Sequence, residues 1–143
     1  MYKRQVLVIK EDCDIFKVKD LVYATNFDDE DKPPLLSAYE FAKQLDAKLH
    51  LVYINTANNF KTTNETEEKM NQMISGVPID NYTLNIYNDS NVEKGILNFA
   101  SSINAGLIGI STHGRKGLSH FINGSLGEDV ANHAKRPVLT IKI

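Results

Sequence analysis

The stretch LIGISTHGRKGLSHFINGSLGEDVANHAKRPVLTI, residues 107–141, holds the pattern that decides the fold. It begins with a short apolar run, passes through a polar segment that contains glycines, and continues with apolar residues at helical spacing. It closes on a second run rich in β-branched residues. A strand, a turn, a helix and a strand in this order predict a right-handed crossover between two parallel strands.

The same alternation runs through the rest of the chain. Short β-rich runs predict strands over residues 21–24, 49–54, 82–87, 107–110 and 138–141. Four helical faces lie between them, formed by Leu35, Ala38, Tyr39, Ala42 and Leu45, by Met70, Met73, Ile74 and Val77, by Val92, Ile96, Phe99, Ala100 and Ile103, and by Leu126, Val130, Ala131 and Ala134. This alternation predicts an α/β fold, a doubly wound (Rossmann-like or flavodoxin-like) parallel sheet of five strands with helices on both faces. We expect the strand order 3-2-1-4-5, with ligands at the carboxyl ends of strands 1 and 4.

Several of the expected helices carry start signals. Pro33 and Pro34 suit the first turn of the first helix. A short polar residue followed three positions later by glutamate forms a capping box, which satisfies free amides at a helix start. This spacing occurs at Asn64 with Glu67, at Ser90 with Glu93 and at Ser125 with Glu128.

Two polar segments fall outside the periodic pattern. Residues 55–66 show no apolar spacing, which predicts a mobile loop. The acidic run Asp28-Asp29-Glu30-Asp31 predicts a solvated turn whose negative charge complements the positive end of the helix that follows.

The N-terminal segment echoes the C-terminal one. The run KRQVLVIK at residues 3–10 closely matches KRPVLTIK at residues 135–142. The echo predicts an extra edge strand in residues 1–12, ahead of the main domain in residues 13–143. We hypothesise that this strand is the tail of a preceding homologous domain in a tandem protein. An ordinary edge strand is the alternative, because short β-rich runs match one another easily.

Composition excludes several classes of protein. The 143 residues fit one compact domain, with 42% hydrophobic and 24% charged residues. The formal net charge of -2 does not suit a nucleic-acid partner, and no apolar run is long enough for a membrane partner. Cys13 is the single cysteine and no signal-peptide pattern is present, so we expect a cytoplasmic protein without disulfides.

The loop between the last two expected strands has the features of a phosphate site. Gly114 and Gly117 allow the backbone to turn sharply and to approach a ligand closely. Gly124 and Ser125 place free amides and a hydroxyl at the start of the next helix, whose positive end attracts phosphate. Arg115 adds positive charge nearby. An ordinary glycine-bearing turn is the alternative, since neither the Walker A nor the dinucleotide pattern is present.

The same loop resembles the nucleotide loop of a known family, the universal stress proteins. The family pattern is glycine, two residues, glycine, nine residues, glycine, and then serine or threonine. Gly114, Gly124 and Ser125 match this pattern, whereas Ser111 replaces its first glycine. The resemblance therefore covers the spacing of the loop and departs from it at one position.

Other parts of the chain resemble the same family. Residues 21–27 look like its first strand and adenosine turn, with Asn26 in place of the usual aspartate and Ala24 in place of the usual proline. Residues 135–139 look like its last strand. The resemblance implies a universal stress protein (UspA-like) domain that binds an adenine nucleotide, with ATP and Mg²⁺ as the first candidates. It implies nucleotide contacts from Ala24, Thr25, Asn26, Val52, Ser111, His113, Gly114, Arg115, Gly117, Gly124, Ser125 and Leu126.

Residues for catalysis or metal binding do not stand out. The 4 histidines lack cysteine or acidic partners at metal-ligand spacing, so we expect hydrogen-bonding or packing roles for them. No serine sits in a nucleophile elbow, so we expect no enzyme beyond slow ATP hydrolysis. The resemblance also implies a homodimer or pseudo-dimer through the last strand, Val138 to Ile141. The alternatives to a nucleotide-binding module are an interaction module that works without nucleotide and a slow nucleotide hydrolase.

Overall fold

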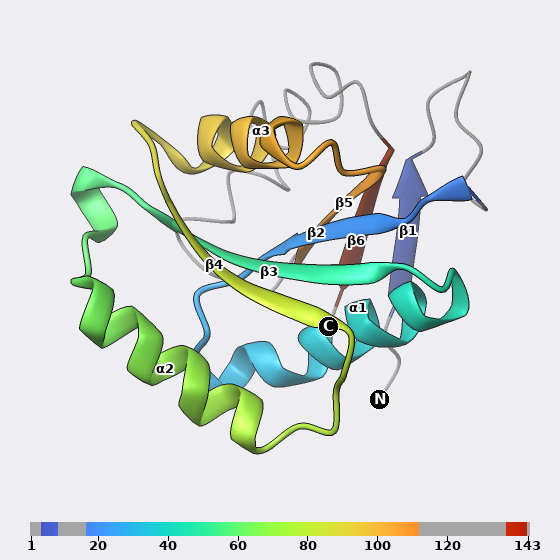
Figure 1. The fold of residues 1–143 in the computed structure, drawn as a ribbon, viewed down its shortest axis with the longest axis horizontal. Coiled ribbons are helices and arrows are strands. Elements are labelled where there is room, and N and C mark those ends of the chain that lie inside the picture. Colours follow the sequence, from blue (N-terminus) through green and yellow to red (C-terminus); the bar gives the residue numbers. More distant parts are fainter. Residues whose placement is uncertain (1–3, 9–16, 112–136, 143) are drawn as a thin grey trace.

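The computed structural model describes residues 4–8, 17–111 and 137–142. They form a 6-stranded sheet with helices on both faces (Figure 1). The strands are β1 (Arg4–Val8), β2 (Asp20–Ala24), β3 (Lys48–Asn55), β4 (Tyr82–Asn88), β5 (Leu107–Ser111) and β6 (Val138–Lys142). The helices are α1 (Lys32–Gln44), α2 (Thr63–Ser75) and α3 (Val92–Ser102), with short 3-10 helices at Asp29–Asp31 and Ala57–Asn59.

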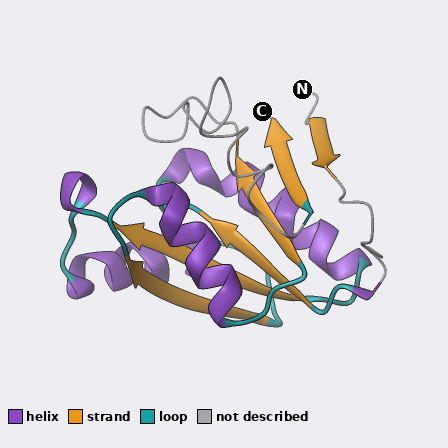
Figure 2. Ribbon diagram, turned by 90° about the horizontal axis from the view of Figure 1, so that it is seen from above, coloured by secondary structure: helices purple, strands orange, loops and turns teal. Residues whose placement is uncertain are grey.

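The sheet has the predicted topology. The strand order is β1-β6-β5-β2-β3-β4, and all pairings among the strands β2 to β6 are parallel. Numbered along the chain from β2, these parallel strands read 3-2-1-4-5, which confirms the doubly wound α/β fold. β1 is the predicted extra edge strand, and it pairs antiparallel with β6 (Figure 2).

Alternation along the strands divides the core into two layers. Leu21, Tyr23 and Leu51 belong to the layer between the sheet and helices α1 and α2. Val22 and Val52 belong to the layer under α3, on the opposite face (Figure 1). Successive side chains of a strand point to opposite faces, and parallel strands are covered on both, so these runs are apolar at almost every position.

Helix α1 begins as the sequence predicts. It starts at Lys32, with prolines in its first turn and with Pro34 buried. The fourth predicted helix, with Leu126, Val130, Ala131 and Ala134, and its cap at Ser125 with Glu128 lie outside the described residues. Over the described ranges, no helix combines the length and the apolar character needed to cross a bilayer.

Helix α2 begins earlier than predicted. The capping box predicted at Asn64 and Glu67 is wrong, because the N-cap is Thr62, whose Oγ1 accepts a hydrogen bond from the Glu65 amide at 3.1 Å. The Glu65 carboxylate accepts from the Thr62 amide in return, at 3.4 Å. Thr66 explains the shift: its side chain is buried and its hydroxyl donates to the Thr62 carbonyl at 3.0 Å. The first turn therefore has to include Thr66.

The cap of α3 is also displaced from its predicted place. The predicted box at Ser90 and Glu93 is wrong, and Asn91 is the N-cap, with its Oδ1 accepting from the Lys94 amide at 2.8 Å. Ser90 is engaged elsewhere, since its amide donates to the Asp89 carboxylate at 2.7 Å. The neighbouring acid thus holds Ser90 outside the helix, and the next residue caps it.

Candidate functional site

The strand order reverses at β2. This strand lies between β3 and β5, and it is parallel to both (Figure 1). In doubly wound sheets, ligands bind at the carboxyl ends of the strands that flank such a reversal. Here those ends are Ala24 of β2 and Ser111 of β5. The described residues around these two strand ends form one part of the predicted nucleotide site.

Two hydrogen bonds shape the turn that follows β2. Thr25 continues the strand pairing, because its amide donates to the Val52 carbonyl at 3.1 Å. Its hydroxyl oxygen accepts from the Phe27 amide at 3.1 Å. Thr25 is only 5% exposed, so water competes little for either bond. These two hydrogen bonds fix the turn, and Asn26, which lies between Thr25 and Phe27, stays partly exposed.

Phe27 has an unusual backbone conformation for a large residue. Its φ is 60°, in the left-handed region, while its side chain is 3% exposed in the core layer of α1 and α2. The other described non-glycine residues with positive φ are Asp46, Asn81 and Asn104, and these residue types tolerate that region well. For phenylalanine the conformation costs about 1–2 kcal/mol. The buried ring holds the turn in this conformation, and such strain is common at functional sites.

The acidic run after the turn is not the solvated turn that the sequence predicts. Asp31 is 3% exposed, and its Oδ2 accepts from the Asp28 amide at 3.0 Å. The Asp31 amide donates to the Asp28 carbonyl at 2.8 Å in return. Asp28 also forms an ion pair with Lys69 of α2. These local hydrogen bonds compensate the carboxylate for lost water, and the ion pair ties the turn to α2.

The connection from β3 to α2 is held by its own side chains. The prediction of a loop throughout residues 55–66 is wrong, since this segment contains a 3-10 helix and the start of α2. The Tyr53 hydroxyl donates to the Asn59 carbonyl, and the Lys61 ammonium lies 5.4 Å from the centre of the Tyr53 ring. The Lys61 amide donates to Asn55 Oδ1 at 3.0 Å. Because these contacts involve backbone and side chains together, they fold a polar segment without an apolar pattern.

Tyr53 makes the stability of the folded state depend on pH in the alkaline range. Burial raises the pKa of Tyr53 above its ordinary value of 10.0, an effect that Lys69 opposes and Asp28 reinforces. The folded state therefore holds this proton more tightly than the unfolded chain does. The resulting stabilisation is complete below about pH 10 and is lost as the pH rises through the folded pKa. We expect the free energy of unfolding, measured in urea from about pH 8 to pH 11, to fall less steeply in Tyr53→Phe than in the wild type.

Tyr39 provides the matched control. Its hydroxyl donates to Asp80 Oδ1 at 2.9 Å in an exposed position. Tyr39→Phe removes one phenol from the chain in the same way, so it controls for the loss of a phenol hydroxyl as such. Parallel curves for the wild type and Tyr53→Phe would contradict the prediction.

The connection after β4 reaches the same end of the sheet. The Asp89 amide donates to the Asn55 carbonyl at 3.0 Å. The Asp89 carboxylate accepts from the Asn98 side chain at 2.9 Å and from the Ser90 amide at 2.7 Å. These hydrogen bonds, with that of Asn98 the largest cause, lower the pKa of Asp89. The loop thus keeps an ionised carboxylate beside the ends of β3 and β4.

The structure brings the described part of the predicted site together at one end of the sheet. Ala24 and Val52 are paired across β2 and β3, and both are buried in the layer under α3. Val52 is 0% exposed, and it contacts the turn through its carbonyl, which accepts a hydrogen bond from the Thr25 amide. The other predicted contacts lie outside the described residues, namely His113, Gly114, Arg115, Gly117, Gly124, Ser125 and Leu126.

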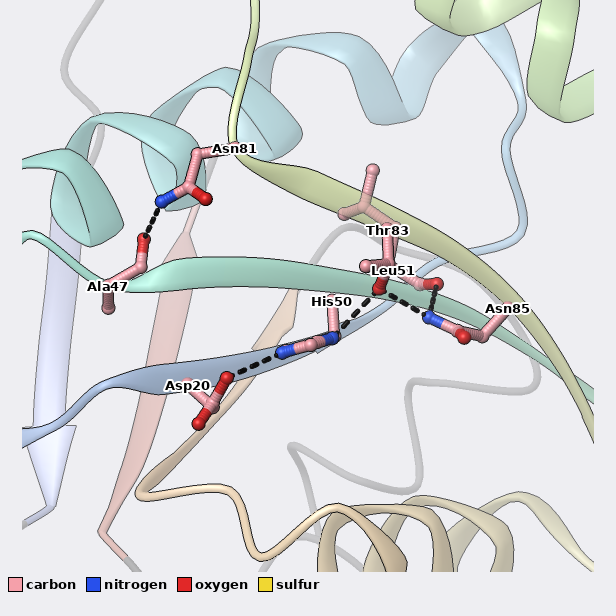
Figure 3. Close-up of polar contacts among 7 residues, drawn as sticks. All are labelled: Asp20, Ala47, His50, Leu51, Asn81, Thr83 and Asn85. Atoms are coloured by element: carbon pink, nitrogen blue, oxygen red, sulfur yellow. Dashed lines mark hydrogen bonds and ion pairs between the residues drawn. The ribbon is translucent and has the colours of Figure 1, made fainter.

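A polar chain that sequence reasoning missed crosses β2, β3 and β4. Figure 3 shows Asp20, His50 and Thr83 in a row across these strands. His50 Nε2 lies 2.8 Å from Asp20 Oδ1, and His50 Nδ1 lies 2.8 Å from Thr83 Oγ1. Asn85 Nδ2 donates to Thr83 Oγ1 at 2.9 Å and to the Leu51 carbonyl at 3.1 Å. His50 thus has the hydrogen-bonding role that the sequence predicts.

The bonds of this chain have one consistent direction when His50 is neutral. Asn85 donates to the Thr83 oxygen, the Thr83 hydroxyl donates to Nδ1 of His50, and Nε2–H donates to the Asp20 carboxylate. Hydroxyl, imidazole and carboxylate also follow one another in a catalytic triad. Here, however, they lie near the amino ends of their strands, opposite the turn after β2. We therefore interpret this row of hydrogen bonds as a structural link between the three strands. Only the cross-strand register brings its residues together.

Two of the cavities lined by described residues lie away from the turn after β2. One of about 450 Å³ lies between α2 and β4, and one of about 220 Å³ lies beside the end of α1. Their lining residues are Glu67, Met70, Asn71, Leu84 and Ile86 for the first and Tyr39, Lys43, Asp46, Ala47, Asp80 and Asn81 for the second. Neither lining includes a predicted nucleotide contact. No group of three or more His, Cys, Asp or Glu side chains that could hold a metal ion occurs in the described ranges.

A comparison with known proteins covers residues 112–136, between β5 and β6, which lie outside the described residues. The model of the universal stress protein family matches residues 86–142, which span α3, β5, β6 and the segment between those two strands. Over these residues the chain is similar to the universal stress protein family. A search of curated proteins found no match.

Solved universal stress proteins share the fold of this chain. One in complex with cAMP is 14% identical, with a TM-score of 0.63, covering 86% of this chain and 96% of its own. UspA from Lactobacillus plantarum is 15% identical, with a TM-score of 0.64 and coverages of 87% and 97%. A universal stress protein from Archaeoglobus fulgidus DSM 4304 is 21% identical, with a TM-score of 0.62 and coverages of 95% and 48%. The chain thus spans nearly all of the first two and about half of the third.

Proposed function

We propose that this chain is a universal stress protein, a cytoplasmic stress-response module that binds an adenine nucleotide, with ATP and Mg²⁺ as the first candidates. The observation that carries the proposal is the turn after β2, at the reversal of strand order. Buried Thr25 and strained Phe27 hold this turn, and Asn26 remains partly exposed on it. A universal stress protein of the same fold is in complex with cAMP, which supports the class of ligand.

In this proposal the adenosine lies against Ala24, Thr25 and Asn26. The Asn26 side chain offers both an acceptor and a donor, so it can pair with an adenine edge or a ribose hydroxyl without a net charge. Val52 supports the adenine side through its bond to Thr25. The tightly bonded turn is thereby prepared for the ligand before the ligand arrives, which reduces the entropy lost on binding.

The phosphates belong, in the same proposal, to the other side of the reversal. Ser111 ends β5, and the loop after it has the glycine spacing of the family. Backbone amides at Gly124 and Ser125 would bind the phosphate oxygens at the positive end of the following helix. Further contacts are assigned to His113, Gly114, Arg115, Gly117 and Leu126. A ligand that spans both sides of the reversal explains why adenosine and phosphate residues lie far apart in the sequence.

ATP with Mg²⁺ is expected to raise the melting temperature. A ligand at a hundred times its dissociation constant stabilises the folded state by about 2.7 kcal/mol. For a domain of this size that corresponds to roughly 8 °C. Differential scanning fluorimetry with and without ATP measures the shift, and calorimetric titration with ATP, ADP, AMP and cAMP ranks the ligands.

Three variants locate the site. Gly124→Asp adds a carboxylate among the proposed phosphate contacts and should abolish the shift. Gly76→Asp makes the same change at an exposed glycine after α2 and should leave the shift intact. Asn26→Asp makes the adenosine contact charge-assisted and should tighten binding about tenfold. A wild-type chain that shows no shift in millimolar ATP would contradict the proposal.

The second candidate is an interaction module that works without nucleotide, and the pairing of β6 favours it. β6 lies between β5 and β1, so the strand proposed for assembly, Val138 to Ile141, is paired along both sides. Of the two assemblies that the family resemblance implies, a homodimer and a pseudo-dimer, this arrangement favours the pseudo-dimer. β1 then takes the position of a partner's last strand, in keeping with the hypothesis of a tandem protein.

A further inference from the structure

β4 forms one edge of the described sheet, and among the described strands it pairs with β3 alone (Figure 1). The pairing covers all 7 residues of β4 in an unbroken register, from Tyr82 opposite Leu49 to Asn88 opposite Asn55. Its sequence, YTLNIYN, contains no proline and no charged residue, which are common protections of a sheet edge. β4 therefore has the regular backbone that an added strand requires.

Hydrogen bonds at both ends of β4 indicate which of its backbone groups point outward. The Asn81 carbonyl accepts from a β3 amide at 3.1 Å, and the Asp89 amide donates to a β3 carbonyl at 3.0 Å. Alternate residues of a strand direct their backbone groups to opposite sides, so the odd-numbered residues of β4 face β3. The amides and carbonyls of Leu84 and Ile86 consequently point away from β3, toward the outer side of the edge.

A groove of about 450 Å³ lies between α2 and this edge strand. Met70 of α2 and Leu84 and Ile86 of β4 form its apolar lining, and Glu67 and Asn71 of α2 form its polar lining. Met70 is 2% exposed, whereas Leu84 and Ile86 stay partly exposed, so the groove opens to solvent on the side of β4. The two strand residues whose side chains line the groove are thus the two whose backbone groups point outward.

We propose that this edge and its groove are a docking site for an extended segment of a partner protein that carries lysine or arginine among apolar residues. The added strand pairs with the outward amides and carbonyls of Leu84 and Ile86 and places alternate side chains in the groove. Main-chain hydrogen bonds provide affinity in this mode of binding, and pockets for alternate side chains provide specificity. The inference goes beyond the proposed function and does not depend on nucleotide binding.

The charge of the groove favours a basic partner. Glu67 is the charged residue of the lining and is exposed, and Glu68 beside it is exposed as well. Lys69 forms an ion pair with Asp28, so its charge is already balanced.

The same charge disfavours a second copy of this chain as the occupant. Antiparallel pairing of β4 with β4 of another copy would place both α2 helices on one face of the joined sheet. The exposed glutamates of the two helices would then approach one another, and like charges across an interface oppose association. A basic segment replaces this repulsion by attraction.

The test uses a fluorescently labelled peptide of seven residues, the length of β4. It carries threonine at odd positions, valine at the second and sixth positions, and lysine in the centre, and a matched peptide carries glutamate in the centre. Fluorescence anisotropy with the full chain should show about threefold to tenfold tighter binding of the lysine peptide, because a repulsion replaces an exposed ion pair in the other. Glu67→Lys should reverse the preference. Glu68→Lys, the same change outside the groove lining, should preserve most of it.

Amide hydrogen exchange, followed by NMR, locates the bound peptide on the chain. The amides of Leu84 and Ile86 should gain protection when the lysine peptide binds, because their outward groups acquire partners. The amides of Thr83 and Asn85 face β3 already and should change little.

Four results would contradict the proposal. They are no binding of the lysine peptide at millimolar concentration, equal binding of both peptides, and binding without protection at Leu84 and Ile86. The fourth is protection of these two amides without peptide that rises with protein concentration, which would assign the edge to a second copy of the chain.

Discussion

Phe27→Ala is expected to destabilise the domain by about 3–5 kcal/mol, the usual cost of removing a buried aromatic ring. The Phe27 side chain is 3% exposed, in the core layer shared with α1 and α2. Its ring also holds the backbone at a φ of 60°. Alanine retains the unfavourable φ but loses the packing that compensates for it. Urea denaturation, followed by circular dichroism, measures the free energy of unfolding.

Phe27→Gly separates strain from packing. Glycine removes one more carbon than alanine does, yet it adopts positive φ freely, so it should be more stable than Phe27→Ala by about 1 kcal/mol. Phe99 is the matched control, since it is 7% exposed and lies within α3 at helical φ. There the order should reverse, with glycine about 1 kcal/mol less stable than alanine. If alanine is the better replacement at both positions, the strain assigned to Phe27 is wrong.

Gly95→Ala is expected to destabilise the domain by about 1–2 kcal/mol, although alanine is the better helix former. A methyl group at Gly95 of α3 would lie 2.3 Å from Cγ2 of Ile54, a residue of β3 that is 5% exposed. Overpacking of a core costs about 1–3 kcal/mol, and the gain in helix propensity, about 1 kcal/mol, offsets only part of it. Chemical denaturation measures the net effect.

A double-mutant cycle with Ile54→Ala tests the cause. Ile54→Ala alone should destabilise by about 2–5 kcal/mol, because it leaves a cavity under α3. In that background the methyl group of Gly95→Ala has room, so the second change should be neutral or stabilising. The expected coupling energy is at least about 1 kcal/mol. Additive effects of the two substitutions would show that Ile54 is not what excludes a side chain at Gly95.

The fold was predictable because its signals are local and repeated. Apolar runs at residues 21–24 and 49–54 lie within observed strands, since a buried parallel strand is apolar on both faces. The β-rich run at residues 82–87 lies within the edge strand β4. Crossover handedness and the alternation of strands and helices then restrict the strand order to few choices. The echo at residues 3–10 also predicted β1 as an edge strand.

The details that failed depend on competition between neighbouring side chains. Asn64 and Ser90 both have the right spacing for a cap, but buried Thr66 draws α2 back to Thr62, and Asp89 holds Ser90 outside α3. Asp31 is buried although it belongs to an acidic run, because the Asp28 amide compensates its carboxylate. Spacing rules do not weigh one acceptor against another, so they misplace such residues by one or two positions.

For the candidate site, the sequence by itself determined which groups are present: the glycine spacing from Gly114 to Gly124 and the amide of Asn26, both of which resemble a known family. The tertiary structure decided where the described part lies, because only strand register brings Thr25 against Val52 and places Ser111 two strands from Val52. It also decided that Phe27 holds the turn at positive φ, and that Leu7 meets Leu139. Residue types and periods are properties of one segment, whereas register and compensated strain arise between segments that only the folded chain brings together.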